Sequence, residues 1–219
     1  MSSPTDVRLR VNEIFYSIQG ESSHAGRPCV FVRLTGCPLR CTYCDTEYAF
    51  HEGRSMHLEE IVAAVGAHPA RLVEVTGGEP LAQPESIALM QRFLDDGYEV
   101  LLETSGALDV SKVPPPVRKI LDLKTPDSGE LERNLWSNLA HLSSHDEVKF
   151  VIQSRRDYEW ARAILREHRL DARVRVLFSP AWESPVRADL AQWMLEDALP
   201  ARYQLQLHKI IWPGVERGV

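Results

Sequence analysis

Short apolar runs recur along the chain and are separated by segments with a different periodicity. The runs are rich in valine, isoleucine and leucine and are bounded by polar or turn-forming residues, a pattern that predicts β-strands. The predicted strands are Pro28–Leu34, Leu72–Thr76, Tyr98–Glu103, Lys119–Leu123, Glu147–Ile152, Arg173–Phe178 and Tyr203–Leu207.

Most of the intervening segments have the periodicity of amphipathic helices. Leu58, Ile61, Val62 and Val65 follow the i, i+3, i+4, i+7 spacing that places apolar side chains on one face of a helix. The same reasoning predicts helices at Ile87–Leu94, Tyr158–Leu165 and Leu190–Met194, and a less regular helix at Leu131–Leu142.

The alternation of strands and helices predicts βαβ units and a parallel sheet. Right-handed crossovers are expected to curve this sheet into an open or partial barrel. The chain has 219 residues, fewer than a full eight-fold barrel usually contains, so we predict an α/β fold with a partial barrel of about six parallel strands. Residues 1–219 are expected to form a single domain with a short tail at 212–219.

The composition is that of a globular protein, with 44% hydrophobic and 26% charged residues. The formal net charge is −6 and the basic residues are scattered, so nucleic acid, which requires a basic surface, is not an expected partner. No apolar run approaches the length of a membrane span, and the polar N-terminal residues lack a signal pattern. These features predict a cytoplasmic protein that acts on a small polar ligand.

Three of the four cysteines lie in one segment, GCPLRCTYCDT at 36–46. Cys37, Cys41 and Cys44 follow a predicted strand, at the end where barrel folds place their active sites. A structural zinc ion requires four ligands, and the segment supplies three thiols with histidines nearby. A 4Fe–4S cluster held by three thiolates instead leaves one iron open for a substrate or cofactor. Cys29 lies inside an apolar strand and is interpreted as a buried free thiol.

The Cys-x3-Cys-x2-Cys spacing, with an aromatic residue before the third cysteine, resembles the signature of the radical S-adenosylmethionine (SAM) superfamily. The resemblance implies a 4Fe–4S cluster on Cys37, Cys41 and Cys44, with SAM bound to the open iron and cleaved to a 5′-deoxyadenosyl radical. VTGGEP, which follows the next predicted strand, matches the Gly-Gly-Glu stretch with which the superfamily binds SAM, and so assigns Gly78 and Glu79 to SAM.

Polar residues also follow other predicted strands. LLETSG places Glu103 at a strand end, and LDLKTP places Asp122 and Lys124 at the next one. Since the carboxyl ends of parallel strands meet at one edge, these side chains are expected to converge. Arg33 lies inside an apolar strand, where a charge is costly unless it is paired or faces a polar cavity.

Seven segments spanning nearly the whole chain together resemble the 7-carboxy-7-deazaguanine synthase family of the queuosine pathway. They are EIFYSIQGES, VFVRLTGCPLRCTYCDT, VTGGEP, LETSG, DLKTP, DEVKFVI and LQLHKIIW. The resemblance implies a lyase that converts 6-carboxy-5,6,7,8-tetrahydropterin to 7-carboxy-7-deazaguanine with loss of ammonia, using SAM, a 4Fe–4S cluster and Mg²⁺. It also implies a homodimer and an electron donor of the flavodoxin or ferredoxin type.

Carried over position by position, the family resemblance implies a role for each matching residue. Substrate contacts fall on Ile18, Gln19, Gly20, Glu21, Arg33, Thr76, Ser179 and Pro213. SAM contacts fall on Tyr43, Cys44, Asp45, Gly78, Glu79, Asp122, Leu123 and Lys124. Thr46 is implied to bind Mg²⁺ through its hydroxyl group, and Glu103 and His208 to transfer protons.

The chain departs from one branch of the family in two places. That branch has Ser-Pro-Lys at positions 122–124 and ends soon after its His-Lys pair, whereas this chain continues to Val219. Two other interpretations stay open. A glycyl-radical activase of the same superfamily shares the cysteine loop but acts on a partner protein, and does not require QGE before the first strand or Arg33 together with Thr46. A non-catalytic zinc-binding module is the alternative outside the enzymes.

Overall fold

The computed structural model describes residues 7–182 and 184–219. Nine strands in these ranges form one open sheet in the order β3-β1-β2-β4-β5-β6-β7-β8-β9. The seven strands from β2 to β9 in this order run parallel, whereas β1 pairs antiparallel with both β2 and β3. The predicted partial barrel is therefore confirmed as an open, mostly parallel sheet, with more strands than predicted.

Six of the seven predicted strands lie close to their expected positions. They are β2 (Pro28–Leu34), β4 (Leu72–Gly77), β5 (Glu99–Thr104), β6 (Arg118–Leu123), β7 (Glu147–Ile152) and β8 (Arg175–Pro180). Two further strands, β1 (Arg8–Ile18) and β3 (Arg54–His57), have no predicted counterpart, because neither is an apolar run: β1 begins with alternating charged and apolar residues, and β3 has one apolar residue, Met56.

The prediction of a strand at Tyr203–Leu207 is wrong for most of its length. β9 covers only Arg202–Tyr203, and the chain continues into the short helix α5 (Leu207–Ile211). The Leu207 N–H donates a hydrogen bond to the Gly20 carbonyl at 2.9 Å, which holds this segment against the loop after β1 instead of at the sheet edge.

The four helices predicted with regular spacing are confirmed. They are α1 (Leu58–Gly66), α2 (Ser86–Asp95), α3 (Arg155–Glu167) and α4 (Arg187–Glu196). The segment Leu131–Leu142 does not form an α-helix and contains two short 3-10 helices, Leu131–Arg133 and Trp136–His141. None of the helices in the described ranges combines the length and apolar character required to cross a lipid bilayer.

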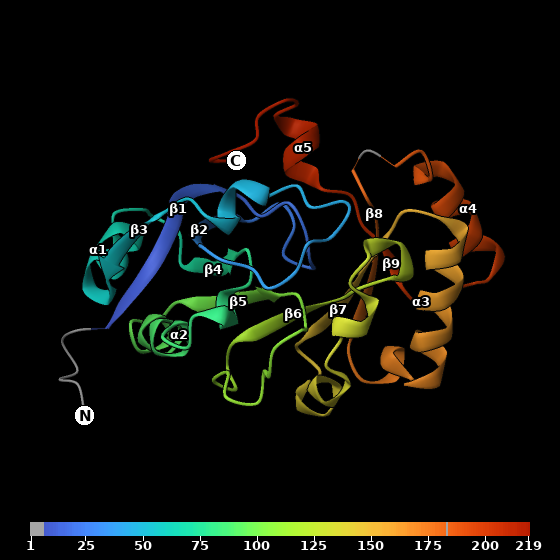
Figure 1. Cartoon of the computed structure of the whole chain (residues 1–219), viewed down its shortest axis with the longest axis horizontal. Helices are drawn as coiled ribbons and strands as arrows, with labels where there is room; N and C mark the ends of the chain where they lie inside the picture. The colour runs from blue at the N-terminus through green and yellow to red at the C-terminus, as the bar shows by residue number, and fades with distance from the viewer. Residues whose placement is uncertain (1–6, 183) are drawn as a thin grey trace.

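The helices lie beside the sheet and pack with it to form the apolar core. α1 and α2 lie beside one end of the curved sheet and α3 and α4 beside the other, while α5 and the C-terminus lie on the side opposite α2 (Figure 1). Most buried apolar residues form one large cluster that includes residues of α1–α4. A second, small cluster contains Cys29, Phe31, Leu72, Leu101 and Ile120, which alternate along their strands with residues of the large one. Cys29 is a fully buried free thiol, as predicted.

Candidate active site

The carboxyl ends of the parallel strands open into a cavity of about 650 Å³. Its other walls come from the segment after β1, the cysteine loop (residues 36–46) and α5. Most predicted site residues line it: Ile18, Gln19, Gly20, Glu21, Arg33, Cys37, Cys41, Tyr43, Cys44, Asp45, Thr46, Thr76, Gly78, Glu103, Asp122, Lys124, Ser179 and His208. The structure does not bring Glu79, Leu123 and Pro213 into the cavity wall.

The cysteine loop is fixed against the end of β4 by backbone hydrogen bonds. The Gly36 N–H donates to the Ala49 carbonyl at 2.8 Å, and the Gly36 carbonyl accepts from the Glu79 N–H at 2.8 Å. Gly78 approaches the loop so closely that a Cβ at this position would lie 2.8 Å from the Cys37 Cβ. Gly78, the second glycine of the Gly-Gly-Glu motif, therefore lets the backbone after β4 approach the cysteine loop more closely than any other residue would allow.

The three cysteines of the loop are free, partly buried and part of the cavity wall. Burial raises the pKa of the Cys41 thiol to about 11 and also raises that of Cys37. In residues 7–182 and 184–219, no three metal-ligating side chains converge around one point. A cluster does not require such convergence, because each thiolate binds a separate iron atom.

The Glu79 side chain is fully buried and joins β4 to β5. Its carboxylate accepts hydrogen bonds from the Ser105 N–H at 2.7 Å, the Thr104 hydroxyl at 2.9 Å and the Leu81 N–H at 3.0 Å. Since these donors hold the carboxylate away from the cavity, Glu79 braces the two strand ends in this structure, and its assignment to SAM stays a prediction.

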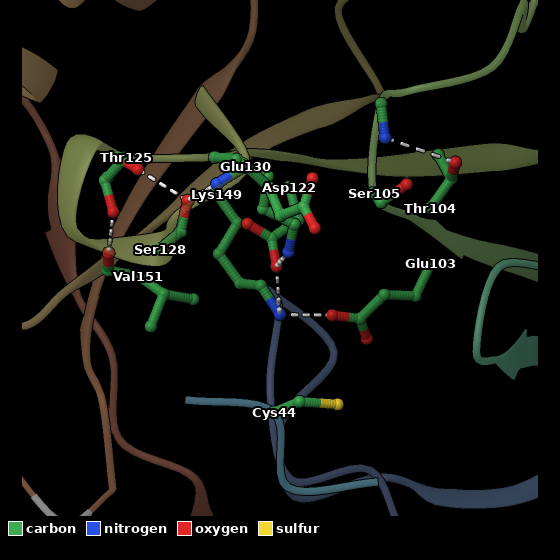
Figure 2. Close-up of polar contacts among 12 residues, drawn as sticks. Cys44, Glu103, Thr104, Ser105, Asp122, Thr125, Ser128, Glu130, Lys149 and Val151 are labelled. Carbon is green, nitrogen blue, oxygen red and sulfur yellow. Dashed lines mark hydrogen bonds and ion pairs between the residues drawn. The ribbon is translucent and has the colours of Figure 1, made fainter. Parts of the chain in front are cut away.

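A buried group of charged side chains extends into the cavity from β5, β6, β7 and the segment after β1. The Lys149 ammonium lies 2.9 Å from Glu21 Oε2 and 3.7 Å from Asp122 Oδ2, and it forms a short ion pair with Glu103 Oε1. Asp122 also binds the Lys124 ammonium at 3.0 Å. Figure 2 shows the Lys149 ammonium between Asp122 and Glu103.

Lys149 and Glu74 line the cavity, but the sequence did not identify either of them as a site residue. Each is a charged residue inside an apolar strand, the signal by which Arg33 was identified. Glu74 accepts a hydrogen bond from Gln19 Nε2, and burial, with the nearby Glu103 and Glu21, raises its pKa well above the usual value. Glu74 is therefore harder to ionise than a solvent-exposed carboxyl group.

Arg33 is both paired and directed at the cavity, which accounts for a charge inside an apolar strand. Its Nε donates to Glu13 Oε1 at 2.8 Å, and its guanidinium lies 5.7 Å from the centre of the Phe15 ring and 5.8 Å from that of Tyr48. Sequence reasoning missed both supporting residues: Glu13 lies on β1, which was not predicted as a strand, and Tyr48 lies in the short 3-10 helix Glu47–Phe50, which was not predicted either.

α5 closes the cavity on the side facing the cysteine loop. Asp45 accepts hydrogen bonds from Lys209 Nζ and from Gln206 Nε2, the latter at 3.0 Å. Burial opposes ionisation of Asp45, but Lys209, Gln206 and Lys149 together outweigh it and lower the Asp45 pKa to about 2. His208 lies beside Gly20, where a Cβ would be 3.0 Å from the His208 backbone nitrogen and would overlap its ring.

Two polar atoms at the cavity wall have no hydrogen-bond partner among the described residues. The Tyr43 hydroxyl and Asp122 Oδ1 are buried and make no hydrogen bond within the described residues. Because buried polar atoms are normally satisfied, these two point to a polar ligand that supplies the missing bonds. Thr46 lies on the same wall, with its hydroxyl 3.9 Å from the Cys44 sulfur.

The chain is similar to known proteins over nearly its whole length. The profile of the Radical SAM superfamily matches residues 31–177. The 7-carboxy-7-deazaguanine synthase of Koribacter versatilis (strain Ellin345) is 48% identical over 226 residues, which cover 96% of this chain and 100% of the relative. The enzyme of the same name from Chlorobaculum tepidum is 46% identical, over 98% of this chain and 99% of the relative. The crystal structure of QueE from Escherichia coli shares the fold, with a TM-score of 0.77, 24% identity and coverage of 92% of this chain and 95% of that chain.

Proposed function

Because the chain belongs to the 7-carboxy-7-deazaguanine synthase family of the radical SAM superfamily, we propose that it converts 6-carboxy-5,6,7,8-tetrahydropterin to 7-carboxy-7-deazaguanine with loss of ammonia. The proposal is supported chiefly by one observation: three free thiols and a buried set of carboxylates and lysines line the same cavity. The thiols proposed to hold the cluster and the groups proposed to transfer protons thus line one cavity. The volume of this cavity, about 650 Å³, falls in the range of ligand pockets.

The residues present fit the 4Fe–4S cluster and SAM that the superfamily uses. Cys37, Cys41 and Cys44 provide three free thiols to hold the cluster, and the unpartnered Tyr43 hydroxyl and Asp122 Oδ1 fit the polar groups of SAM. When bound, these cofactors supply reductive cleavage of SAM and the radical that abstracts a hydrogen atom. The chain itself orients them and separates them from bulk water.

The substrate is assigned to the part of the cavity lined by polar residues from β1, β2 and the segment between them. Arg33 supplies a fixed positive charge for a carboxylate, and Gln19 and Glu21 supply hydrogen-bonding groups for the pterin. Ile18, Gly20, Thr76 and Ser179 complete this wall.

Glu103 and His208 are proposed to carry the proton transfers of the ring contraction. Burial raises the pKa of Glu103, although Lys149 partly offsets this effect. Burial lowers the pKa of His208, against the opposing influence of Glu21 and Asp45. Both shifts favour the neutral forms, in which the Glu103 carboxyl group can donate a proton and the His208 ring can accept one.

The test of the proposed reaction uses the full chain, reconstituted anaerobically with iron and sulfide. Incubation with a reductant, SAM and 6-carboxy-5,6,7,8-tetrahydropterin is expected to give 7-carboxy-7-deazaguanine and ammonia in equal amounts, measured by mass spectrometry and an ammonia assay. Cleavage of SAM without either product would reject the proposed substrate, and failure to bind iron and sulfide would reject the enzyme class.

Mg²⁺ is proposed to bind at Thr46, whose hydroxyl is a hard oxygen ligand at the cavity wall. Thr46→Ala is expected to raise the Mg²⁺ concentration needed for half-maximal rate by about tenfold, equivalent to about 1.4 kcal/mol of binding energy. Steady-state rates over a Mg²⁺ titration measure the effect.

Two further variants control this Mg²⁺ titration. Thr46→Ser retains the hydroxyl group and is expected to respond to Mg²⁺ like the native chain. Thr42→Ala removes a hydroxyl that donates to the Asp127 carbonyl at 2.7 Å and accepts from Gln153 Nε2 at 2.9 Å, and it is expected to leave the Mg²⁺ response unchanged. An identical Mg²⁺ response in Thr46→Ala and the native chain excludes Thr46 as a ligand.

The remaining features of the proposal concern the cellular context. The enzyme is proposed to act in the cytoplasm as a homodimer and to receive electrons from a flavodoxin- or ferredoxin-type protein. Family membership supports these assignments. The electron donor is also required by the chemistry, because the cluster must be reduced by one electron before it can cleave SAM.

A further inference from the structure

One charged side chain reaches the cavity from β7, the strand to which the sequence assigns no functional residue. Lys149 is 5% exposed, and its ammonium group faces three carboxylates delivered by three different parts of the chain. It lies 2.9 Å from Glu21 Oε2 and 3.7 Å from Asp122 Oδ2, and it pairs at short range with Glu103. Figure 2 shows the ammonium group directed at the Glu103 carboxylate.

The three carboxylates depend on Lys149 to different degrees. Asp122 has a second cation, Lys124, at 3.0 Å. Glu21 accepts further hydrogen bonds from Gln206 Nε2 at 3.0 Å and from Gln204 Nε2 at 3.3 Å. Within the described part of the chain, the Glu103 carboxylate has Lys149 as its single hydrogen-bonding partner.

This asymmetry separates the proton affinities of two neighbouring acids. Burial opposes ionisation of Glu21, but Lys149, His208 and the bond from Gln206 outweigh it and lower the Glu21 pKa. Burial also opposes ionisation of Glu103, and there Lys149 only partly offsets it, so the Glu103 pKa is raised. Two carboxylates driven in opposite directions are a recurrent arrangement of acid–base sites, in which one stays ionised and the other exchanges a proton.

We propose that Lys149 is a positioning residue for Glu103: its ammonium group fixes the Glu103 carboxylate in the cavity and governs when that carboxylate releases its proton. This inference rests on the proposed function, because it concerns the group assigned to proton transfer there. Lys149 does not itself exchange a proton, since its three carboxylate neighbours outweigh the effect of burial and raise its pKa well above the usual value.

Other charged and titratable groups face this pair and are unchanged in the variants below. They are Glu21 on the segment after β1, Glu74 on β4, Asp122 and Lys124 on β6, Tyr43 and Asp45 on the cysteine loop, and His208 on α5. The sign of the expected change is fixed by charge: a cation favours the ionised carboxylate, so removing it raises the pH at which Glu103 ionises.

The test compares the native chain with Lys149→Met, which removes the charge and nearly conserves the length of the side chain. In the cluster-loaded full chain without SAM or substrate, the carboxyl carbonyl band of Glu103 is followed by infrared difference spectroscopy over pH, with Glu103→Gln used to assign it. The midpoint of this titration is expected to move upward by about one pH unit or more in Lys149→Met. The limb of the rate–pH profile that belongs to Glu103 moves in the same direction, and kcat falls by about 100-fold.

Matched variants separate positioning from a structural role. Lys149→Arg retains the charge and is expected to keep the Glu103 midpoint and to restore most of the rate. Lys119 provides the control for loss of a buried lysine: its ammonium pairs with Asp146 at 3.1 Å outside the cavity, and it is 4% exposed. Lys119→Met is expected to lower stability without moving either the infrared midpoint or the rate–pH profile.

Two outcomes overturn the inference. One is an unchanged Glu103 midpoint in Lys149→Met, or in Lys149→Gln if the methionine variant does not fold. The other is an equal shift of the midpoint in Lys119→Met. The infrared titration does not depend on turnover, so it decides the role of Lys149 even if the chain fails to form 7-carboxy-7-deazaguanine, a result that would reject only the proposed function.

Discussion

Replacing Cys44 with alanine is expected to abolish stable cluster binding and product formation. Cys37, Cys41 and Cys44 are the three free thiols of the cavity wall, and a cluster that keeps one open iron has no spare ligand. After anaerobic reconstitution, Cys44→Ala is expected to lose most of its iron and sulfide, and to lack the broad absorbance near about 400 nm that such clusters give. Iron and sulfide analysis measures the loss directly, independently of activity.

Cys29 gives the matched control, because it is a free thiol outside the cavity wall. It is fully buried on β2 and packs with Phe31, Leu72, Leu101 and Ile120. Cys29→Ala is expected to retain iron and activity while losing about 1 kcal/mol of unfolding free energy, the usual scale for a small core truncation. Equal iron loss from both variants would contradict a specific role of the loop cysteines, as would full iron content in Cys44→Ala.

Replacing Gly78 with alanine is expected to displace the cysteine loop, although the change adds only one methyl group. The new Cβ would lie 2.8 Å from the Cys37 Cβ and 2.7 Å from the Gly36 carbonyl carbon. These neighbours belong to the backbone or are directly attached to it, so no side-chain rotation relieves the overlap. We expect a loss of about 1–3 kcal/mol in unfolding free energy, together with reduced iron content after reconstitution.

Gly66→Ala is the control for this substitution. Gly66 is the last residue of α1, and a Cβ there meets nothing nearer than the Tyr98 hydroxyl, at 3.9 Å. Alanine at this position is expected to stabilise the protein by about 0.4–1 kcal/mol and to leave the iron content unchanged. Denaturant unfolding and iron analysis of both variants give the comparison, and native iron content in Gly78→Ala would show that the loop tolerates the displacement.

The central strands and their helices were predictable because each has a strong local pattern, even where a strand contains a charged residue. β2 and β4–β8 are short apolar runs, and α1–α4 have regular amphipathic spacing. β1 was missed because its first four residues alternate charged and apolar side chains and so do not form an apolar run. The Tyr203–Leu207 strand was wrong since alternation over five residues does not reveal the hydrogen bond from the Leu207 N–H to the Gly20 carbonyl, which forms between distant parts of the chain.

The site was predictable to the extent that its residues lie in compact motifs. The three loop cysteines and Glu103 stand in such motifs and line the cavity as expected. Lys149 and Glu74 were missed because a single charge in a strand does not reveal which side chains will surround it. Glu79 shows the opposite case. It stands in a recognised motif, but its carboxylate is hydrogen-bonded to Thr104 and Ser105 of the neighbouring strand end and does not reach the cavity.

The bonds of Glu79 have a mechanical consequence for the enzyme. Its backbone N–H holds the Gly36 carbonyl of the cysteine loop at 2.8 Å, while its carboxylate holds the Ser105 N–H and the Thr104 hydroxyl directly after Glu103. One residue thus connects the loop proposed to hold the cluster to the strand that carries Glu103, the proposed proton-transfer group. The loop and the strand are expected to move as one rigid body, so that their separation changes little during thermal fluctuations and a shift imposed on one is transmitted to the other.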